Sequence, residues 1–498
     1  MPTALLVLLA LGATKNVSTS AALQTAISTA VVGDEIVLAD GTYDFASSPS
    51  CSASGTPAAP IVVRAANRLK ARIRFNTLEG FKVTGPHWRF DGLDVVGVCA
   101  ADSNCEHAFH VSGRAVGFQL LRSRVVDFNA QLKVNASPAG DGGYDIPHQG
   151  LIESTELFDT HPRNTSNPTT KLNIDTGDDW VLRGNFIHDF HKGGGDNVSY
   201  GLFLKSGGHR GLVERNLVIC TYDLATGGTR IGTSFGGGGT GNQFCAPAFN
   251  AAVPCSIEHT DGTMRNNLIA NCSDVGIYLN RAKNTKVLHN TLVATNGVDF
   301  RFDTTSGEAS GNVLASNIRS RNDGGLTLGT NLAGRAPADF SGWYVDPLRG
   351  DFRIGGDVSA LIGKVPVRTE VRDDYCGRSR PAAGNVAFGA LEHSLGDCAT
   401  VFTADGGAGG GAGGGAGGGA GGGVGGGVGG GVGGGAAGGS GGGVGGGSAG
   451  GAGGGAETTP TGCGCHSTSE LNLLALVLGA FAALRSARRS PRIPHLGN

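Results

Sequence analysis

The sequence carries almost no net charge. Its 39 Lys and Arg residues are balanced by 41 Asp and Glu residues, so the formal net charge is −2 at pH 7. Proteins that bind nucleic acid through their overall field are strongly basic, and nothing in this composition favours that class. We therefore expect no nucleic acid partner, and any site for an acidic ligand must be a local patch of cations.

Long helical patterns are also missing from the centre of the chain. Between Lys171 and Asn312 the β-forming residues occur in runs of three to five, broken by Gly, Asn or Asp. No stretch there is long enough for an amphipathic helix. This absence argues against a helical fold.

A short motif recurs many times in the sequence. In its strong copies an Asn is followed by two or three mostly aliphatic residues. Strong copies begin at Asn185, Asn216, Asn267, Asn290 and Asn312, and weaker copies begin at Leu93, Ser123 and Thr155. Successive copies are separated by 30, 32, 30, 31, 51, 23 and 22 residues. Repetition in this range of periods is typical of a repeat architecture.

The period and the residue types favour a parallel β-helix. Coils of about 22 residues suit three short strands and three turns, and successive coils stack about 4.8 Å apart. An Asn at a turn tolerates the left-handed conformation and can hydrogen-bond to neighbouring coils. We interpret the repeated Asn as structural rather than catalytic. The 51-residue step predicts an insertion between Thr221 and Glu258.

Nine of the 11 Cys lie in the body of the chain, and their spacing predicts disulfides. Three close pairs would each close a short loop, and Cys220 with Cys272 is a plausible fourth pair, which leaves Cys51 unpaired. The close pairs are Cys99 with Cys105, Cys245 with Cys255 and Cys376 with Cys398. Disulfides indicate an exported protein. Buried free thiols in a cytosolic protein are the alternative.

The chain divides into four parts. Residues 1–16 contain an apolar run without a basic segment before it, and we read them as a signal peptide, with an ordinary buried strand or helix as the alternative. Residues 17–398 form the β-helix, with a helix over Ala21–Ala30 covering its first coil and a segment from Trp343 to Glu392 covering its last. Residues 399–461 are a Gly-rich linker and residues 462–498 a tail.

The early coils carry a family resemblance. The segments GDEIVLADGTY (33–43), PIVVRAA (60–66) and FKVTGPHWRFDGLDV (81–95) resemble the opening coils of the chondroitinase B and alginate lyase family of polysaccharide lyases. The resemblance implies an all-β, right-handed parallel β-helix of the pectin lyase-like type. It also implies eliminative cleavage of a uronic-acid-containing polysaccharide. The alternative is a non-catalytic β-helix that serves surface display or glycan binding.

Counting back from the repeated Asn residues brings several polar side chains to one face. Asp175, Lys205 and Asn280 fall at nearly the same place on their coils, and Arg230 falls about two residues earlier, roughly 8 Å from Lys205. Elimination from a uronic acid needs a base for the C5 proton, cations that neutralise the carboxylate and a donor for the leaving oxygen. A Lys whose pKa is lowered by a neighbouring Arg can be that base.

The same residues extend the family resemblance. The segments LFLKSGGHRGLVERN (202–216) and GGTRIGTSFGG (227–237) resemble the family's Lys at a strand end and Arg on the following coil. The resemblance implies that Lys205 is the base and Arg230 the acid. Further residues are predicted to bind substrate: Asp175, Asn280, His209, Arg210, Glu258 and His259.

A metal requirement stays open. The family places two acidic calcium ligands shortly before the Lys, whereas Asp196 is the only acidic residue in that stretch here. Either the metal is absent and an Arg or Lys neutralises the substrate carboxylate, or this β-helix no longer cleaves; the family resemblance alone implies calcium. Asp175, Asp178 and Asp179 form a carboxylate cluster of the kind calcium favours, or are turn residues. The loop from His188 to Asp196 fits no zinc spacing, and we read it as a polar loop.

The tail predicts the location. Gly462-Cys-Gly-Cys465, an apolar stretch from Leu471 to Leu484 and an Arg cluster follow the Gly-rich linker. This order resembles the C-terminal sorting tail of myxobacterial surface proteins, which implies export, attachment to the cell surface or outer membrane through the tail, and a cytoplasmic basic flank. Fourteen residues are short for a transmembrane helix, which needs about 20, so we expect a processed signal. We expect a monomer whose partner is an acidic polysaccharide.

Overall fold

Three long parallel sheets make up most of the structure. The computed structural model of the chain describes residues 12–225 and 227–400, which belong to one compact unit. Short strands separated by tight turns recur in the same order, and each strand pairs with its equivalents in the preceding and following coils.

We name the three sheets A, B and C. Sheet A contains, in spatial order, β1 (Thr14–Val17), β2 (Glu35–Leu38), β5 (Ile61–Ala65), β8 (Trp88–Asp91), β11 (Gln119–Leu121), β16 (Leu151–Glu153), β19 (Val181–Arg183), β23 (Leu212–Glu214), β27 (Thr263–Arg265), β31 (Thr285–Leu288), β34 (Ser306–Ser310) and β37 (Gly325–Leu328). Sheet B contains β3 (Gly41–Phe45), β6 (Ala71–Phe75), β9 (Asp94–Gly97), β12 (Arg124–Val126), β17 (Glu156–Phe158), β20 (Phe186–His188), β24 (Leu217–Ile219), β28 (Leu268–Ala270), β32 (Thr291–Val293) and β35 (Val313–Leu314). Sheet C contains β4 (Ser50–Cys51), β7 (Glu79–Val83), β10 (His107–Ser112), β13 (Ala130–Asn135), β18 (Thr169–Asp175), β21 (Val198–Lys205), β25 (Thr229–Phe235), β29 (Ile277–Asn280), β33 (Val298–Arg301) and β36 (Ile318–Arg321).

The remaining elements are short. They are the pair β14 (Ser137–Pro138) and β15 (Tyr144–Asp145), the trio β22 (Gly208–His209), β26 (His259–Thr260) and β30 (Ala282–Lys283), the pairs β38 (Tyr344–Asp346) with β39 (Asp351–Ile354) and β40 (Val365–Pro366) with β41 (Asn385–Val386), and the helices α1 (Ser20–Ser28) and α2 (Pro337–Trp343).

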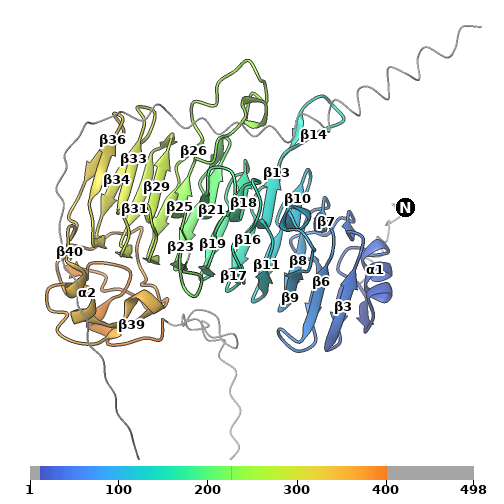
Figure 1. Cartoon of the computed structure of the whole chain (residues 1–498), viewed down its shortest axis with the longest axis horizontal. Helices are drawn as coiled ribbons and strands as arrows, with labels where there is room; N and C mark the ends of the chain where they lie inside the picture. The colour runs from blue at the N-terminus through green and yellow to red at the C-terminus, as the bar shows by residue number, and fades with distance from the viewer. Residues whose placement is uncertain (1–11, 226, 401–498) are drawn as a thin grey trace, which may run out of the picture. The chain divides into compact units, whose positions relative to one another are not determined.

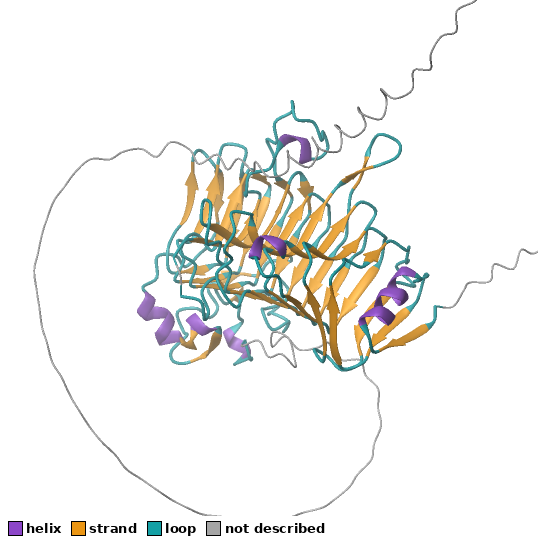
Figure 2. Cartoon of the chain, turned by 45° about the vertical axis from the view of Figure 1, so that its right-hand side comes forward, coloured by secondary structure: helices purple, strands orange, loops and turns teal. Residues whose placement is uncertain are grey.

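Stacked coils define the fold. Figure 1 shows the sheet strands lying side by side from β7 to β36, and Figure 2 shows the same strands in orange as continuous sheets. Crossovers between parallel strands are right-handed in nearly all proteins. The chain is a right-handed parallel β-helix, as the repeat predicted.

Alternation along each strand separates the core from the outer surface. In β21, Leu202 and Leu204 point inward and are almost fully buried, whereas Phe203 and Lys205 lie on the outer face of sheet C. Because side chains alternate across a strand, the interior is apolar and the outer positions are available for chemistry.

A column of buried amides fixes the register of the coils. The Oδ1 atoms of five residues each accept hydrogen bonds from the backbone N–H and the Nδ2 atom of the polar residue one coil earlier; the backbone bonds are 2.8–3.1 Å long, and the five are Asn216, Asn267, Asn290, Asn312 and Asn331. Ser123 and Thr155 continue the column with their hydroxyls. The structural reading of the repeated Asn is confirmed.

The predicted cross-links are also present. All four predicted disulfides form, and Cys51 is buried and free. The insertion lies where the 51-residue step placed it, between β25 and β26, and the Cys245–Cys255 bond closes a loop within it.

Of the two predicted covers of the β-helix, the N-terminal one lies where the sequence placed it and the C-terminal one does not. The expected first helix is α1, which lies beside the first strands at the N-terminal end of the stack (Figure 1). The predicted C-terminal cover of the last coil is wrong in its position. Phe340, Trp343 and Phe352 pack against outer residues of β20, β24, β28, β32 and β35, because these sheet B strands expose an apolar stripe that needs covering.

Parts of the predicted organisation reach beyond the described residues. The predicted boundary after residue 16 falls inside β1, the first strand of sheet A. Residues 1–11 and the whole tail lie outside the described residues. Within residues 12–225 and 227–400, no helix combines the length and apolar character that crossing a membrane requires.

The amide column generates the first prediction. Replacement Asn267→Ala removes the acceptor of the Asn216 backbone N–H and of one Asn216 Nδ2–H, and also a donor to the carbonyl of Val213; each unsatisfied buried group costs about 1–3 kcal/mol. We expect the free energy of unfolding, measured by urea denaturation, to fall by about 3 kcal/mol or more. The exposed Asn104→Ala serves as the control and should change it by less than about 0.5 kcal/mol. Equal effects would contradict the ladder's role.

Candidate functional site

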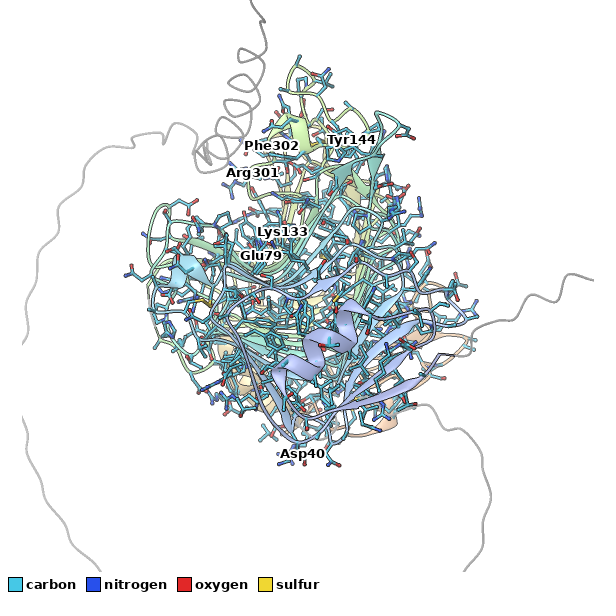
Figure 3. The ribbon with its side chains drawn as sticks, turned by 90° about the vertical axis from the view of Figure 1, so that its right-hand side faces the viewer. Asp40, Glu79, Lys133, Tyr144, Arg301 and Phe302 are labelled. Carbon is cyan, nitrogen blue, oxygen red and sulfur yellow. A yellow bond between two sulfur atoms is a disulfide. The ribbon has the colours of Figure 1, made fainter. Side chains whose placement is uncertain are left out.

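The outer ends of the sheet C strands bring the predicted residues into one row. Asp175, the last residue of β18, pairs with Lys205, the last residue of β21. Two strands further along, Asn280 follows Leu279, which pairs with Phe235 in β25. The predicted alignment of Asp175, Lys205 and Asn280 is confirmed. Viewed along the stack in Figure 3, Glu79, Lys133 and Arg301 lie toward the same side of the β-helix, away from Asp40.

Asp175 holds two cations. Its Oδ1 atom lies 3.1 Å from Lys205 Nζ, and its Oδ2 atom contacts Lys133 Nζ from the coil before. Ser206 Oγ donates a hydrogen bond of 3.2 Å to the same carboxylate. Burial acts to raise the pKa of Asp175, but the two ammonium groups outweigh it and lower the pKa to about 2.

Glu258 lies on the other side of Ser206. Its Oε2 atom accepts hydrogen bonds from the Ser206 backbone N–H at 3.0 Å and from Thr240 Oγ1 at 2.7 Å. The hydroxyls of Thr240 and Ser206 lie 3.2 Å apart, so a chain of hydrogen bonds joins Glu258 to Asp175. Burial raises the pKa of Glu258 despite the nearby Lys205. Neighbouring carboxyl groups with pKa values shifted in opposite directions are typical of acid–base sites.

Two loops border this network. One follows β13 and contains Tyr144, and the other follows β25 and contains Phe249. The rings stack with centroids 3.9 Å apart, although β18 and β21 lie between the two parent strands in sheet C. The aromatic pair therefore bridges across the coils that carry Asp175 and Lys205.

The predicted approach of Arg230 to Lys205 is wrong. Arg230 pairs with Ser199, whereas the register places Gly236 opposite Lys205, and six residues of strand separate the two positions by about 20 Å. The insertion follows β25, so counting from the next ladder Asn misjudges the phase of this coil. Arg230 is buried, which lowers its pKa, and it donates a hydrogen bond to the carbonyl of Gly227.

His259 is also misplaced by the sequence. Its ring stacks on Phe235 inside the β-helix with centroids 4.2 Å apart, and it is fully buried. Burial lowers its pKa to about 3, so the ring is neutral. A core histidine cannot contact a polysaccharide on the outer surface, and the predicted substrate-binding role is withdrawn.

His209 and Arg210 bind carboxylates of the preceding coil. His209 Nδ1 lies 2.9 Å from Asp178 Oδ1, and Arg210 contacts Asp179 at 2.7 and 2.8 Å. Asp178 and Asp179 therefore pair with cationic or imidazole groups at a turn, while Asp175 belongs to the lysine network. The three carboxylates do not converge on one calcium position.

The loop after Asn185 is structural, as expected. His188 stacks between Phe158 and Phe186 and lies 2.9 Å from Asp189. The Oδ1 atom of Asp189 accepts the backbone N–H groups of three consecutive residues, 222–224. These contacts explain the density of polar residues without a metal.

Several residues on the outer face of sheet C were not predicted as site residues from the sequence. Lys133 belongs to the Asp175 network, and Arg301 donates a 2.7 Å hydrogen bond to Tyr278 Oη. Glu79, His107 and His110 bring three potential metal-ligating atoms within 4.8 Å of one another. The alternation of inward and outward side chains along each strand could have identified them. In Gln131-Leu-Lys-Val134, for example, Leu132 and Val134 point into the core, so Lys133 points outward.

A second cationic hollow lies elsewhere. A cavity of about 440 Å³ is lined by Arg64, Arg68, Asp91 and Arg122 between sheets A and B. Arg122 pairs with Asp91 there, and Arg64 lies 2.6 Å from Glu35. Its residues carry no acid–base pair of the kind seen on sheet C.

Comparisons with known proteins found similarity among solved structures alone. No family model matches the sequence, and no curated protein matches it either. Among solved structures, the pectate lyase Pel9A aligns with a TM-score of 0.51 and 14% identity over 76% of this chain and 96% of its own. A rhamnogalacturonan lyase aligns at 0.44 with 14% identity over 75% and 92%, and an alginate lyase from Paenibacillus sp. str. FPU-7 at 0.38 with 17% identity over 64% and 99%. The first similarity supports the parallel β-helix class.

The Asp175 network generates the second prediction. A carboxyl whose folded pKa lies near 2 stabilises the protein fully above about pH 4, and this contribution of about 2 kcal/mol disappears as the pH falls toward 2. The stability difference between wild type and Asp175→Asn, measured by urea unfolding, should narrow by about that amount between pH 5 and pH 2. The exposed Asp303→Asn should show a difference near zero throughout. A pH-independent Asp175→Asn difference would contradict the ion pairs.

Proposed function

We propose that the outer face of sheet C binds a uronic-acid-containing polysaccharide and cleaves it by β-elimination at Lys205. The observation that carries the proposal is the network joining Glu258, with its raised pKa, to Asp175, with its lowered pKa, between Lys133 and Lys205. Cations continue along the same face to Arg301, about 24 Å from the Lys133 coil at the spacing of stacked strands. This row suits a linear acidic polymer.

The residues divide the reaction between them. Lys133 neutralises the substrate carboxylate, in competition with Asp175, and so acidifies the C5 proton. The lone pair of Lys205 Nζ takes that proton, the C4–C5 double bond forms and the C4–O bond breaks. The leaving oxygen receives a proton from the Thr240 hydroxyl, and protonated Glu258 returns a proton to that hydroxyl as their hydrogen bond reverses; this pair takes the acid role expected of Arg230.

A glycan-binding function without cleavage is the second candidate. It is favoured by the ion pair that engages Lys205 with Asp175 and by the distance of Arg230 from Lys205. Both candidates use the same surface and differ in whether a product forms.

Lyase assays provide the third prediction. The full-length protein, incubated with polygalacturonate, alginate or chondroitin, should generate the ultraviolet absorbance of an unsaturated uronide with at least one of them. Lys205→Ala should lower kcat by about 100-fold or more, because a positioned base contributes about 10²–10⁴-fold. The exposed Lys70→Ala is the matched control and should leave kcat unchanged.

The outcomes separate the candidates. Unchanged activity in Lys205→Ala would remove this residue as the base. Binding of a polyuronide in affinity electrophoresis without any product would support the binding function, and absence of both binding and product would contradict both.

We also propose that the tail holds the β-helix at the outer cell surface. The support is the order of Gly-rich linker, Cys463, Cys465, short apolar stretch and Arg cluster, together with four disulfides in the body. A short apolar segment anchors weakly alone, so we expect cleavage near the Cys pair and transfer of a Cys to a lipid.

Mass spectrometry of cell-surface protein gives the fourth prediction. The C-terminal peptide should end near Cys463 or Cys465 and carry a lipid mass on a Cys. An unmodified end at Asn498 would contradict processing, and recovery from the cytosol alone would contradict the location.

A further inference from the structure

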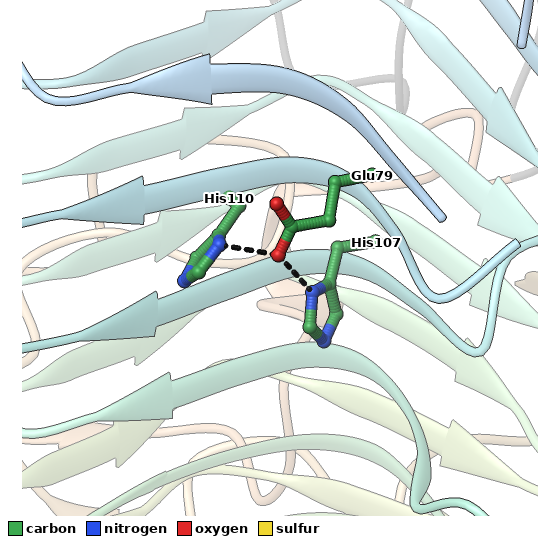
Figure 4. Close-up of side chains that lie close together, drawn as sticks. All are labelled: Glu79, His107 and His110. Carbon is green, nitrogen blue, oxygen red and sulfur yellow. Dashed lines mark ion pairs between the residues drawn. The ribbon is translucent and has the colours of Figure 1, made fainter. Parts of the chain in front are cut away.

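Three side chains on β7 and β10 converge at one point of the outer face. Glu79 pairs with His107 across the two strands, and His110 lies three residues further along β10, opposite Lys82 (Figure 4). Glu79 Oε1 lies 2.7 Å from His110 Nδ1 and 3.6 Å from His107 Nδ1. The side chains are 16–24% exposed, so the cluster is half-buried but reachable from solvent.

The proton on His110 is fixed by its other neighbour. Asn135 Nδ2 donates to the carbonyl of Ala136 at 2.9 Å, so Asn135 Oδ1 faces the His110 ring and accepts from Nε2–H at 2.7 Å. Nδ1 is then the ring atom that faces the Glu79 carboxylate at 2.7 Å, the position from which both groups can reach a shared cation.

His107 supplies a second lone pair. Its Nδ1 atom is buried, has no hydrogen-bond partner among the described residues and faces the same oxygen. Burial lowers the pKa of His107 against the effect of Glu79. A bound cation would give this buried nitrogen the partner that it lacks.

The spacing suits a small tetrahedral ion. Metal–ligand bonds of 2.0–2.1 Å place neighbouring ligands about 3.3 Å apart, and the observed 2.7 and 3.6 Å lie on either side of that value. We propose that Glu79, His107 and His110 bind a divalent transition metal of the zinc class, with the fourth position open to the outer face of sheet C. Two imidazoles and one carboxylate form a donor set that favours zinc over calcium.

The surrounding charges are compatible with a cation. Lys82 Nζ holds the other carboxylate oxygen, Glu79 Oε2, at 2.9 Å and leaves Oε1 for the metal. The charge of Lys133, the next cation on this face, is balanced by Asp175, and Glu106 adds negative charge near His107. Asn135 acts behind the ligand, orienting His110 as such partners do in metal sites.

The open position shares a face with the lysine network. β18 lies two strands from β10, so Asp175 is about 10 Å along the sheet from this cluster. The metal proposal stands on its own contacts and does not depend on the lyase assignment.

Calorimetry with zinc tests the site. All proteins are full-length and carry Cys463→Ser and Cys465→Ser, because thiolates are zinc ligands and would compete with the site for the metal. We expect one Zn²⁺ per chain and no heat with Ca²⁺. His107→Ala and His110→Ala should each weaken Zn²⁺ binding by more than about 100-fold, and Asn135→Ala by about 10–100-fold. His161→Ala, an exposed histidine facing Asp102 and Asp127, should bind as the parent does.

Cobalt provides an independent readout. Co²⁺ in the parent protein should give the visible absorption of a four- or five-coordinate ion, and His110→Ala should abolish it. If circular dichroism shows that an alanine variant does not fold, Glu79→Gln takes its place. This change keeps the side-chain size and should also weaken Zn²⁺ binding. No Zn²⁺ binding by the parent, or equal binding by the folded His107 and His110 variants, would overturn the proposal. Lyase activity is not the readout, so the two proposals fail separately.

Discussion

The hydrogen bonds of the buried Asn column set the register on which the rest of the molecule depends. Each amide bonds to the backbone of a neighbouring coil, so a slip of one residue would leave buried donors and acceptors unsatisfied at every level. With the register fixed, residues that are far apart in sequence stand in straight rows on the outside of each sheet. Asp175 and Lys205 are 30 residues apart and adjacent in space for this reason.

The outer face of sheet C uses these rows for charge. Lys133, Asp175 and Lys205 belong to three successive strands, and the alternating signs let buried ionic groups pair rather than repel. Glu258 enters from the insertion and is buried, which raises its pKa even though Thr240 and the Ser206 backbone N–H donate hydrogen bonds to its carboxylate. The fold sets the spacing of the charged residues, and the long loops after β13 and β25 border the site on either side.

The sequence predicted what depends on the period and missed what depends on phase. Asn spacing gave the fold, the insertion and the row of Asp175, Lys205 and Asn280, and cysteine spacing gave all four disulfides. Arg230 and His259 flank the insertion, where residue counting from the next ladder Asn no longer gives the position within a coil. Arg230 lies near the start of its strand, and His259 lies in the core. His107 and His110 lie in coils whose ladder residue is Ser123 or an earlier position rather than Asn, so no strong copy pointed to them. The C-terminal segment covers sheet B because lateral apolar stripes are not visible in a repeat count.

The central claim is that the outer face of sheet C is the surface that holds an acidic polysaccharide. A crystal structure of the full-length Lys205→Ala protein with a uronic-acid oligosaccharide tests it most directly. We predict that the sugar chain lies across the outer ends of β13, β18, β21 and β29, with a carboxylate at Lys133. An oligosaccharide bound instead in the cavity lined by Arg64, Arg68 and Arg122, with sheet C unoccupied, would contradict the account.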